Sequence, residues 1–243
     1  GNIGEIAYEK TAMAALTGDT KGIEFYDGSV KVLNGDGSEQ IFQPREYTRF
    51  IVEEPVSYSY AKKPYISVDG DRKPFRVGPL PRLLLSPNIQ YDASRELYRD
   101  FESMNRRWLS HPLLYNLARL IESVYCFERI LDLVDELQNT PMIPRAKTVM
   151  KEGDGIGVVE APRGLLIHHY RCDKNGIITY ANLIIPTAMN IPILEQDIGE
   201  TVKLLIDRHQ MDGEYIKKKI LNLVRSYDPC ISCATHSIHI IKH

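Results

Sequence analysis

One local pattern in this chain points directly to chemistry through its residue types and their spacing. Asp228-Pro229 is followed by Cys230 and Cys233, and His236 comes three residues later. Two thiolates three positions apart converge in a turn, where they can chelate one soft metal ion. Pro229 favours extended backbone at Asp228, which suits the end of a helix that leads into a metal-binding turn. The motif therefore predicts a metal site.

Two other kinds of site fit the same cysteine pair. A structural zinc site needs two further ligands at a recognisable spacing, and none is evident in the sequence. A thioredoxin-like redox pair usually follows a strand and opens a helix, whereas this pair follows a predicted helix. The spacing alone leaves these alternatives open.

Two further segments could present polar groups to a ligand. In Glu160–Gly164 an arginine, Arg163, stands between a proline and a glycine, so its backbone is fixed and its guanidinium is free to point into a site. A surface arginine in a turn is the simpler interpretation. In Ile185–Asn190, Thr187 follows a proline and offers a hydroxyl and a backbone N–H, although the segment alone reads as a plain loop.

The first part of the chain, residues 1–92, is predicted to be rich in strands and loops. Asp27-Gly28 between residues 22–26 and 30–33 indicates a hairpin, and residues 34–37 indicate a second turn before a strand at 40–42. Six prolines between residues 55 and 92 discourage long helices and central strands. We expect an extended, irregular segment there.

The remainder, residues 93–243, is predicted to be a helical core that carries the three motifs and forms one structural unit. Residues 93–138 contain a stripe of apolar residues at helical spacing, which we expect to pack in the core together with Cys126. Residues 156–187 have strand character with a hairpin turn at 174–176, and residues 192–209 and 213–225 indicate two helices. The predicted class is α+β, with a helix-rich core and flanking β-hairpins.

Composition excludes several classes of protein. The chain has 243 residues, 43% hydrophobic and 26% charged, with a formal net charge of -2, which gives no case for nucleic acid as a partner. No apolar run reaches the roughly 18 residues needed to span a bilayer. Four cysteines argue against a disulfide-stapled secreted fold, and no signal peptide is visible, so we expect a cytoplasmic protein.

Taken together, the motifs resemble the large, catalytic subunit of nickel–iron hydrogenases, from about residue 45 to the end. The matching segments are Phe75–Arg82, Glu160–Gly164 with His168, Pro186-Thr187 with Asn190, and Asp228–His236. Ala234 and Thr235 before His236, with generally short loops, look like the cytoplasmic hydrogenases of methanogens, whether F420-reducing or not. The resemblance implies the C-terminal part of that large-subunit fold.

The resemblance also implies roles for individual residues. Four thiolates of the family hold nickel, and two of them bridge to an iron that carries carbon monoxide and cyanide; Cys230 would be a terminal ligand and Cys233 a bridging one. Arg163 would lie over the open metal position, paired with Asp228, and these two would be the catalytic residues. Thr187 and the backbone near Pro162 would donate hydrogen bonds to the cyanides, and Glu160 and His168 would lie among the surrounding residues.

These roles require Arg163, Thr187, Asp228, Cys230 and Cys233 to converge on one pocket. Because a side chain extends only several ångströms from its backbone, we expect Arg163 within about 15 Å of Cys233.

The family also has a second ion and a processing step at the end of the subunit. By resemblance, His236 and the carbonyl of Leu183 would bind magnesium or iron. A dedicated endopeptidase would cut between His236 and Ser237 once nickel is loaded, so the tail at 237–243 identifies an unprocessed form. A permanent tail is the alternative.

One departure from the family pattern changes the expectation for this chain. The first cysteine pair of the family, and the glutamate relay beside it, have no counterpart, and Cys126 and Cys172 do not replace them. We therefore expect a C-terminal fragment or one part of a split subunit, which alone would bind no cofactor and would be inactive.

Partners follow from the same resemblance. We expect a small iron–sulfur subunit, maturation chaperones and the endopeptidase, and self-association through apolar faces left exposed. Two competing hypotheses are a non-catalytic relative of the complex I large-subunit type and an unrelated zinc-binding interaction module.

Overall fold

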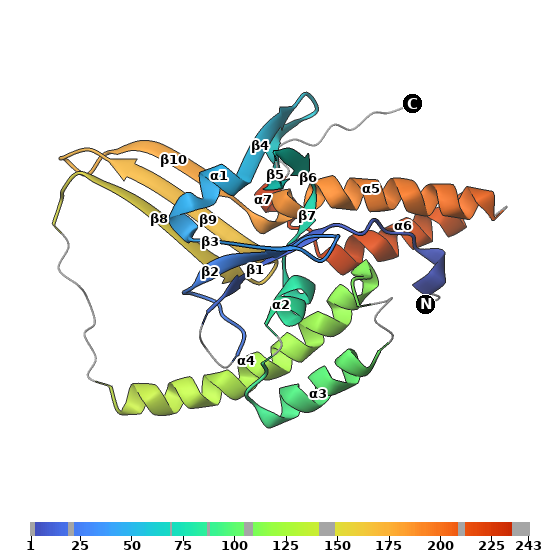
Figure 1. The fold of residues 1–243 in the computed structure, drawn as a ribbon, viewed down its shortest axis with the longest axis horizontal. Coiled ribbons are helices and arrows are strands. Elements are labelled where there is room, and N and C mark those ends of the chain that lie inside the picture. The colour runs from blue at the N-terminus through green and yellow to red at the C-terminus, as the bar shows by residue number, and fades with distance from the viewer. Residues whose placement is uncertain are drawn as a thin grey trace.

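The computed structural model describes residues 3–18, 22–68, 70–86, 88–104, 109–140, 149–208 and 212–234. Three small antiparallel or mixed sheets lie among helices, with two long helices on one side and a long β-hairpin arm on the other (Figure 1). The predicted α+β class is confirmed. None of the helices in these ranges is both long and apolar enough to cross a membrane.

The first sheet has the strand order β3-β2-β1-β7. Its strands are β1 (Ala12–Thr17), β2 (Ser29–Leu33), β3 (Glu39–Phe42) and β7 (Phe75–Arg76). The predicted hairpin between β2 and β3 is confirmed.

The predicted hairpin around Asp27-Gly28 is wrong, because β2 pairs with β1 and residues 22–26 form no strand. The physical reason is a local turn: the Glu24 carboxylate accepts the backbone N–H groups of Phe25, Tyr26 and Asp27. Those amides are therefore not available to a neighbouring strand.

The segment predicted to be irregular, residues 55–92, is instead mostly regular. Strands β4 (Ile51–Val56), β5 (Ser59–Val68) and β6 (Asp71–Lys73) form a sheet, and α2 (Pro79–Leu85) follows β7. Pro64 is tolerated inside β5 because it pairs with β4 alone, whereas β6 pairs only with Ile66–Val68. Pro79 and Pro81 lie in the first turn of α2, where the missing N–H groups have no intrahelical partner to lose.

The helical predictions agree with the structure in type and differ in their bounds. The long helices are α3 (Asp92–Ser103), α4 (Tyr115–Gln138), α5 (Pro186–Asp207) and α6 (Gly213–Tyr227). Short helical turns occur at η1 (Ile3–Glu5), η2 (Pro44–Glu46), α1 (Tyr47–Phe50), η3 (Pro112–Leu114) and α7 (Ile231–Ala234). Helix α5 starts six residues before the predicted 192 and contains Pro192, so the segment read as a loop around Thr187 is the first turn of a helix.

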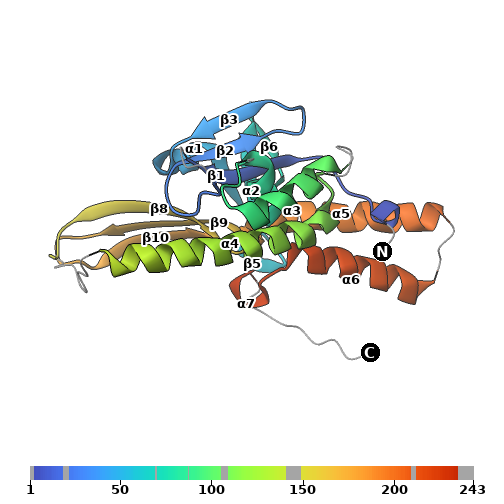
Figure 2. The ribbon, with the colours of Figure 1, turned by 90° about the horizontal axis from the view of Figure 1, so that it is seen from below.

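Only part of the apolar stripe on α4 packs in the core. Ile121 is fully buried, but Phe127 is 71% exposed and Leu131 is 69% exposed, and Val134 is also exposed. Cys126, predicted to be buried, is exposed as well. The reason is that α4 extends beyond α2 and α3 (Figure 2). The start of α3 contacts Glu128 and Asp132 on one side of α4, and the described residues leave the side that carries Phe127 and Leu131 exposed.

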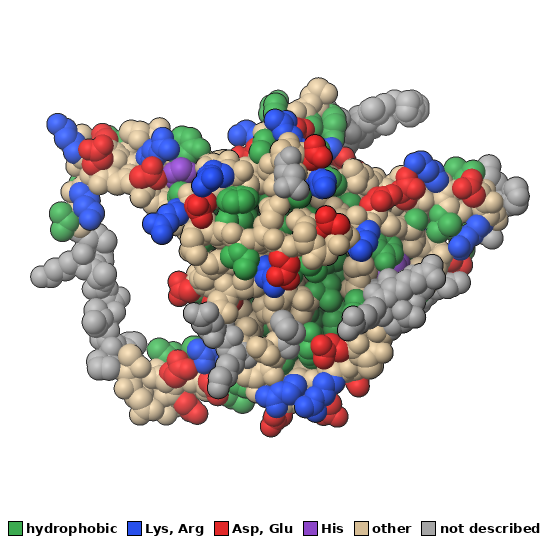
Figure 3. All heavy atoms as spheres, viewed as in Figure 1, with side chains coloured by type: hydrophobic (Ala, Val, Ile, Leu, Met, Phe, Trp, Pro, Cys, Tyr) green, Lys and Arg blue, Asp and Glu red, His purple; other side chains and the backbone are tan. Residues whose placement is uncertain are grey.

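The hairpin arm consists of β8 (Gly153–Ala161), β9 (Gly164–Cys172) and β10 (Ile178–Ile184) in the order β10-β9-β8. The predicted turn at 174–176 is confirmed, with Gly176 at φ 76°. The base of this sheet packs with β1, β2 and β5 in one apolar core, and α2 to α6 enclose a second. On the face seen in Figure 3, acidic and basic side chains are interspersed.

Candidate metal centre

The cysteine turn follows directly from the end of α6. Asp228 caps that helix with a left-handed backbone (φ 51°, ψ 55°), so the predicted extended conformation before Pro229 is wrong. Aspartate tolerates this conformation at a helix end, where the chain must reverse. Cys230 and Cys233 lie across the resulting turn, with their Cα atoms 5.3 Å apart and their sulfur atoms joined.

Thr187 fixes the start of this turn. Its Oγ1 accepts the backbone N–H of Cys230 at 3.1 Å, across 43 positions of sequence. Thr187 is buried in the first turn of α5, where the preceding proline begins the helix. A hydroxyl that accepts one hydrogen bond still has its own O–H to donate.

Arg163 approaches the same turn from the connection between β8 and β9. Its Nε lies 2.5 Å from the carbonyl oxygen of Asp228 and 3.2 Å from Oδ2 of the same residue. The structure thus contains the Arg163–Asp228 pair, and these contacts join Arg163 and Thr187 to the turn that carries Cys230 and Cys233.

Two glycines let the chain pass close to this arginine. Gly164 has φ 132°, and a Cβ there would lie 2.5 Å from Cγ2 of Val77. Gly78 has φ 115°, and a Cβ there would lie 2.8 Å from the carbonyl oxygen of Arg163. Only glycine allows this backbone conformation and this approach without strain.

A buried cluster of charges lies behind the arginine. Arg82 of α2 forms ion pairs with Glu122 of α4 and Glu160 of β8, each at 2.6 Å, and all three side chains are buried. Glu160 also accepts the backbone N–H of Leu16 at 2.8 Å. Burial nonetheless raises the pKa of Glu160 to about 7, because the desolvation of its charge outweighs the attraction of Arg82.

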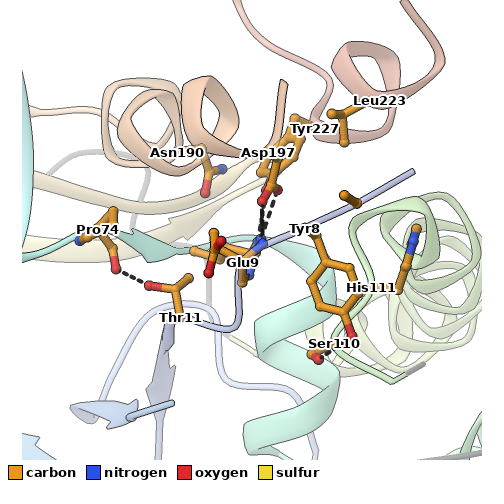
Figure 4. A network of polar contacts seen from close by, with 12 residues as sticks. Tyr8, Glu9, Thr11, Pro74, Ser110, His111, Asn190, Asp197, Leu223 and Tyr227 are labelled. Atoms are coloured by element: carbon orange, nitrogen blue, oxygen red, sulfur yellow. Dashed lines mark hydrogen bonds and ion pairs between the residues drawn. The ribbon is translucent and has the colours of Figure 1, made fainter. Parts of the chain in front are cut away.

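A second buried network joins β7 to α5 and α6. Asp197 accepts both Arg76 Nη2, at 3.0 and 2.8 Å, and the hydroxyl of Tyr227 at 2.6 Å. The Asp197 and Tyr227 side chains meet beside Glu9, whose backbone N–H also bonds Asp197 (Figure 4). Asn190 on α5 bonds both backbone groups of Val77, which holds the Phe75–Arg82 segment against that helix.

Among the other predicted site residues, His168 and Leu183 are described by the structure, whereas two lie outside the described residues. His168 on β9 lies opposite Leu183 on β10, and its Nδ1 contacts the hydroxyl of Tyr170 at 3.2 Å. Neither residue has a contact with the cysteine turn among those the structure gives. His236 and Ser237 lie outside the described residues.

Sequence reasoning missed Glu122, Arg76, Asp197 and Tyr227. A single charged residue within an amphipathic helix gives no sign that it is buried, since its ion-pair partner is distant in sequence. The signal that could have indicated these partners is the pair of arginines in Phe75–Arg82, because an arginine that is buried requires a carboxylate.

A cavity of about 400 Å³ opens beside these residues. Its wall includes Glu122, Glu160, Pro162 and Asp228 together with exposed apolar residues of α4. The cavity therefore connects the turn around Arg163, residues 161–164, with the exposed Phe127 and Ile130 of α4.

The donor set fits half of a four-thiolate metal site. Once reduced, Cys230 and Cys233 would place two thiolates together in the turn, beside a guanidinium and a buried hydroxyl. In the part of the chain that the structure describes, no group of three or more His, Cys, Asp or Glu side chains could hold a metal ion. Further ligands must complete the site.

Comparison with known proteins gives a consistent result. The sequence pattern of the nickel-dependent hydrogenase family matches residues 19–236. The F420-non-reducing hydrogenase of Methanothermobacter thermautotrophicus has one subunit that is 37% identical over 223 residues, covering 88% of this chain and 46% of that protein. The alpha subunit of sulfhydrogenase 1 from Pyrococcus furiosus is 35% identical over 225 residues, covering 92% and 49%.

A solved structure agrees with these relatives. The NAD+-reducing NiFe hydrogenase in the H2-reduced state superimposes with a TM-score of 0.86 at 31% identity, over 96% of this chain and 52% of that one. The fold is that of a nickel-dependent hydrogenase large subunit. The chain belongs to the nickel-dependent hydrogenase family, as its motifs indicated, and spans about half the length of the relatives it matches.

Proposed function

We propose that this chain supplies half of the nickel–iron site of a hydrogenase large subunit. The reaction would be the reversible heterolytic cleavage of dihydrogen, with electrons passed to a small iron–sulfur subunit. The observation that carries the proposal is the contact between Arg163 and Asp228 directly beside the Cys230–Cys233 turn.

Each residue of the site has a definite task in this reaction. As thiolates, Cys230 and Cys233 would hold nickel, and the second would bridge to an iron with carbon monoxide and cyanide ligands. Asp228 holds the Arg163 guanidinium through Nε, and the other N–H groups of that guanidinium can stabilise charge that develops as dihydrogen is split. Thr187 positions the turn through its oxygen and keeps its O–H to donate to a cyanide.

The bound centre would supply the Lewis acidity that polarises dihydrogen and the redox capacity that accepts its electrons. Two more thiolates are required for it, and we propose that a complementing part of the large subunit provides them. The exposed apolar residues of α4 support this proposal, because an apolar patch bordering an incomplete site is typical of an interface.

Metal analysis of the assembled protein tests the function. We expect nickel and iron to be bound, with turnover of dihydrogen abolished in Cys233→Ser because a hydroxyl is a poor bridging ligand for soft metals. Cys172→Ser, in the hairpin arm, is the matched control and should keep both. Binding of zinc alone, or of no metal, would refute the proposal in favour of the zinc module or the non-catalytic relative.

The role of Arg163 requires its own test. Arg163→Lys should retain nickel and iron yet lose most of the rate, since lysine lacks the planar fork of donors. Normal turnover in that variant would remove Arg163 from the catalytic residues.

Assembly and maturation complete the proposal. Self-association of the isolated chain would proceed through α4, so Leu131→Lys should shift it toward the monomer in sedimentation, whereas Lys203→Glu on α5 should not.

We further propose a cytoplasmic location, maturation chaperones, cleavage at His236–Ser237, and a magnesium or iron ion held by His236 and the Leu183 carbonyl. An active enzyme whose intact mass includes 237–243 would refute the cleavage and the role of His236.

A further inference from the structure

The two peptide carbonyls immediately before Arg163 are bonded by one buried side chain. Arg82 donates from Nη1 to the carbonyl oxygen of Ala161 at 3.0 Å and from Nη2 to that of Pro162 at 3.2 Å. The side chain of Arg82 is 1% exposed. A buried guanidinium therefore holds the backbone that leads into Arg163.

Two carboxylates fix the orientation of this guanidinium. Glu122 accepts Nε at 2.6 Å and Nη2 at 2.7 Å, and Glu160 accepts Nη1 at 2.6 Å. Together with the two carbonyls, these bonds provide one acceptor for each N–H of the guanidinium. The group has no alternative orientation that keeps them all, because its five donors lie in one rigid plane.

The backbone of the segment that contains Arg82 also packs against this turn. Gly78, four residues before Arg82, lies against the carbonyl oxygen of Arg163, and Gly164 lies against Val77. Residues on both sides of Arg163 are thus fixed by the segment Val77–Arg82, while the side chain of Arg163 is directed to Asp228.

We propose that Arg82, oriented by Glu122 and Glu160, is a positioning residue that sets the place of the Arg163 guanidinium over the metal centre. The inference deepens the proposed function and rests on it for the catalytic consequence. It assigns Arg82 no contact with substrate. Its effect on rate passes through the Ala161 and Pro162 carbonyls.

Hydrogen–deuterium exchange of the chain tests the clamp without any metal. A lysine at position 82 has only three donors and no fork, so Arg82→Lys should speed exchange in peptides spanning 161–165 by at least about tenfold, the equivalent of one lost bond to a charged group. Phe101→Leu, in the buried face of α3, is the control for general destabilisation and should leave these peptides unchanged. Equal exchange in the two variants would overturn the clamp. If Arg82→Lys fails to fold, Glu122→Gln replaces it, because this variant keeps the arginine and disturbs only its orientation. Glu122→Gln should speed exchange in the same peptides by a smaller factor. No acceleration in this variant would equally overturn the clamp.

A double-mutant cycle in the assembled, metal-loaded enzyme tests the catalytic consequence. Arg82→Lys should lower kcat at least about tenfold while KM and metal content stay the same, and adding it to Arg163→Lys should lower kcat by less than about threefold further. Losses that multiply, or loss of metal, would overturn the positioning role. If the wild-type assembly does not turn over dihydrogen, the proposed function fails, whereas the exchange experiment still decides whether the clamp exists.

Discussion

Removing the charge of Asp197 should have the largest effect on stability among single polar changes in the second network. Its carboxylate and the Arg76 guanidinium are both completely buried, and Asp197 accepts four hydrogen bonds from Arg76, Tyr227 and the Glu9 backbone. Asp197→Asn leaves a guanidinium without its counter-charge in the core and places an amide donor against other donors. Breaking a buried ion pair in this way costs about 3–5 kcal/mol.

Urea unfolding followed by far-UV circular dichroism would measure this cost. Glu200→Gln is the matched control, because Glu200 lies on the same helix and pairs with the exposed Lys203. An exposed pair contributes about 0–1 kcal/mol, so the two variants should differ by at least about 2 kcal/mol. If Asp197→Asn unfolds within about 1 kcal/mol of Glu200→Gln, the network is not the buried, fully paired unit described above.

Three other changes follow from the site. The pKa of Glu160 is raised from 4.5 to about 7, so between these pH values the folded chain keeps a proton that the unfolded chain releases. As the pH rises from 4.5 to 7, the free energy of unfolding should therefore fall by up to about 3 kcal/mol relative to that of Glu160→Gln. Parallel pH profiles of the two proteins would contradict this. Gly164→Ala should cost about 2–4 kcal/mol in urea unfolding, whereas Gly157→Ala, where a methyl group meets open space, should stay within about 0.5 kcal/mol; equal costs would disprove the close approach. Thr187→Val should cost about 1 kcal/mol and speed exchange of the Cys230 amide, and Thr187→Ser should restore both; a neutral valine variant would show that the bond contributes nothing.

Local signals in the sequence predicted what depends on local physics. Asn175-Gly176 forms the expected hairpin because glycine adopts the positive φ that the turn requires. Asp27-Gly28 carries the same signal and forms no hairpin, because the carboxylate of Glu24 binds the preceding amides and β2 pairs with β1. A turn dipeptide thus indicates a reversal without identifying the strand that follows it.

Periodicity and motifs had a similar limit. The stripe on α4 correctly predicted a helix with one apolar face, but spacing does not show whether another surface covers that face, as exposed Phe127 demonstrates. The motifs indicated Arg163, Thr187 and the cysteines because each is a short run of chemically distinctive residues. The partners of Arg82 have no such signature, since 40 and 78 positions separate it from Glu122 and Glu160.

The long sequence separations around the site have a consequence for the order of events during synthesis. The contacts from Arg163 to Asp228 and from Thr187 to Cys230 span 65 and 43 positions, and in both the cysteine turn is the partner made later. When Cys230 leaves the ribosome, the residues of the hairpin arm and of the start of α5 have already been synthesised, so both partners of the cysteine turn are available to it. Contacts of such separation close slowly compared with local structure. If these thiols hold nickel as proposed, the interval before the contacts close is the period in which metal delivery would take place.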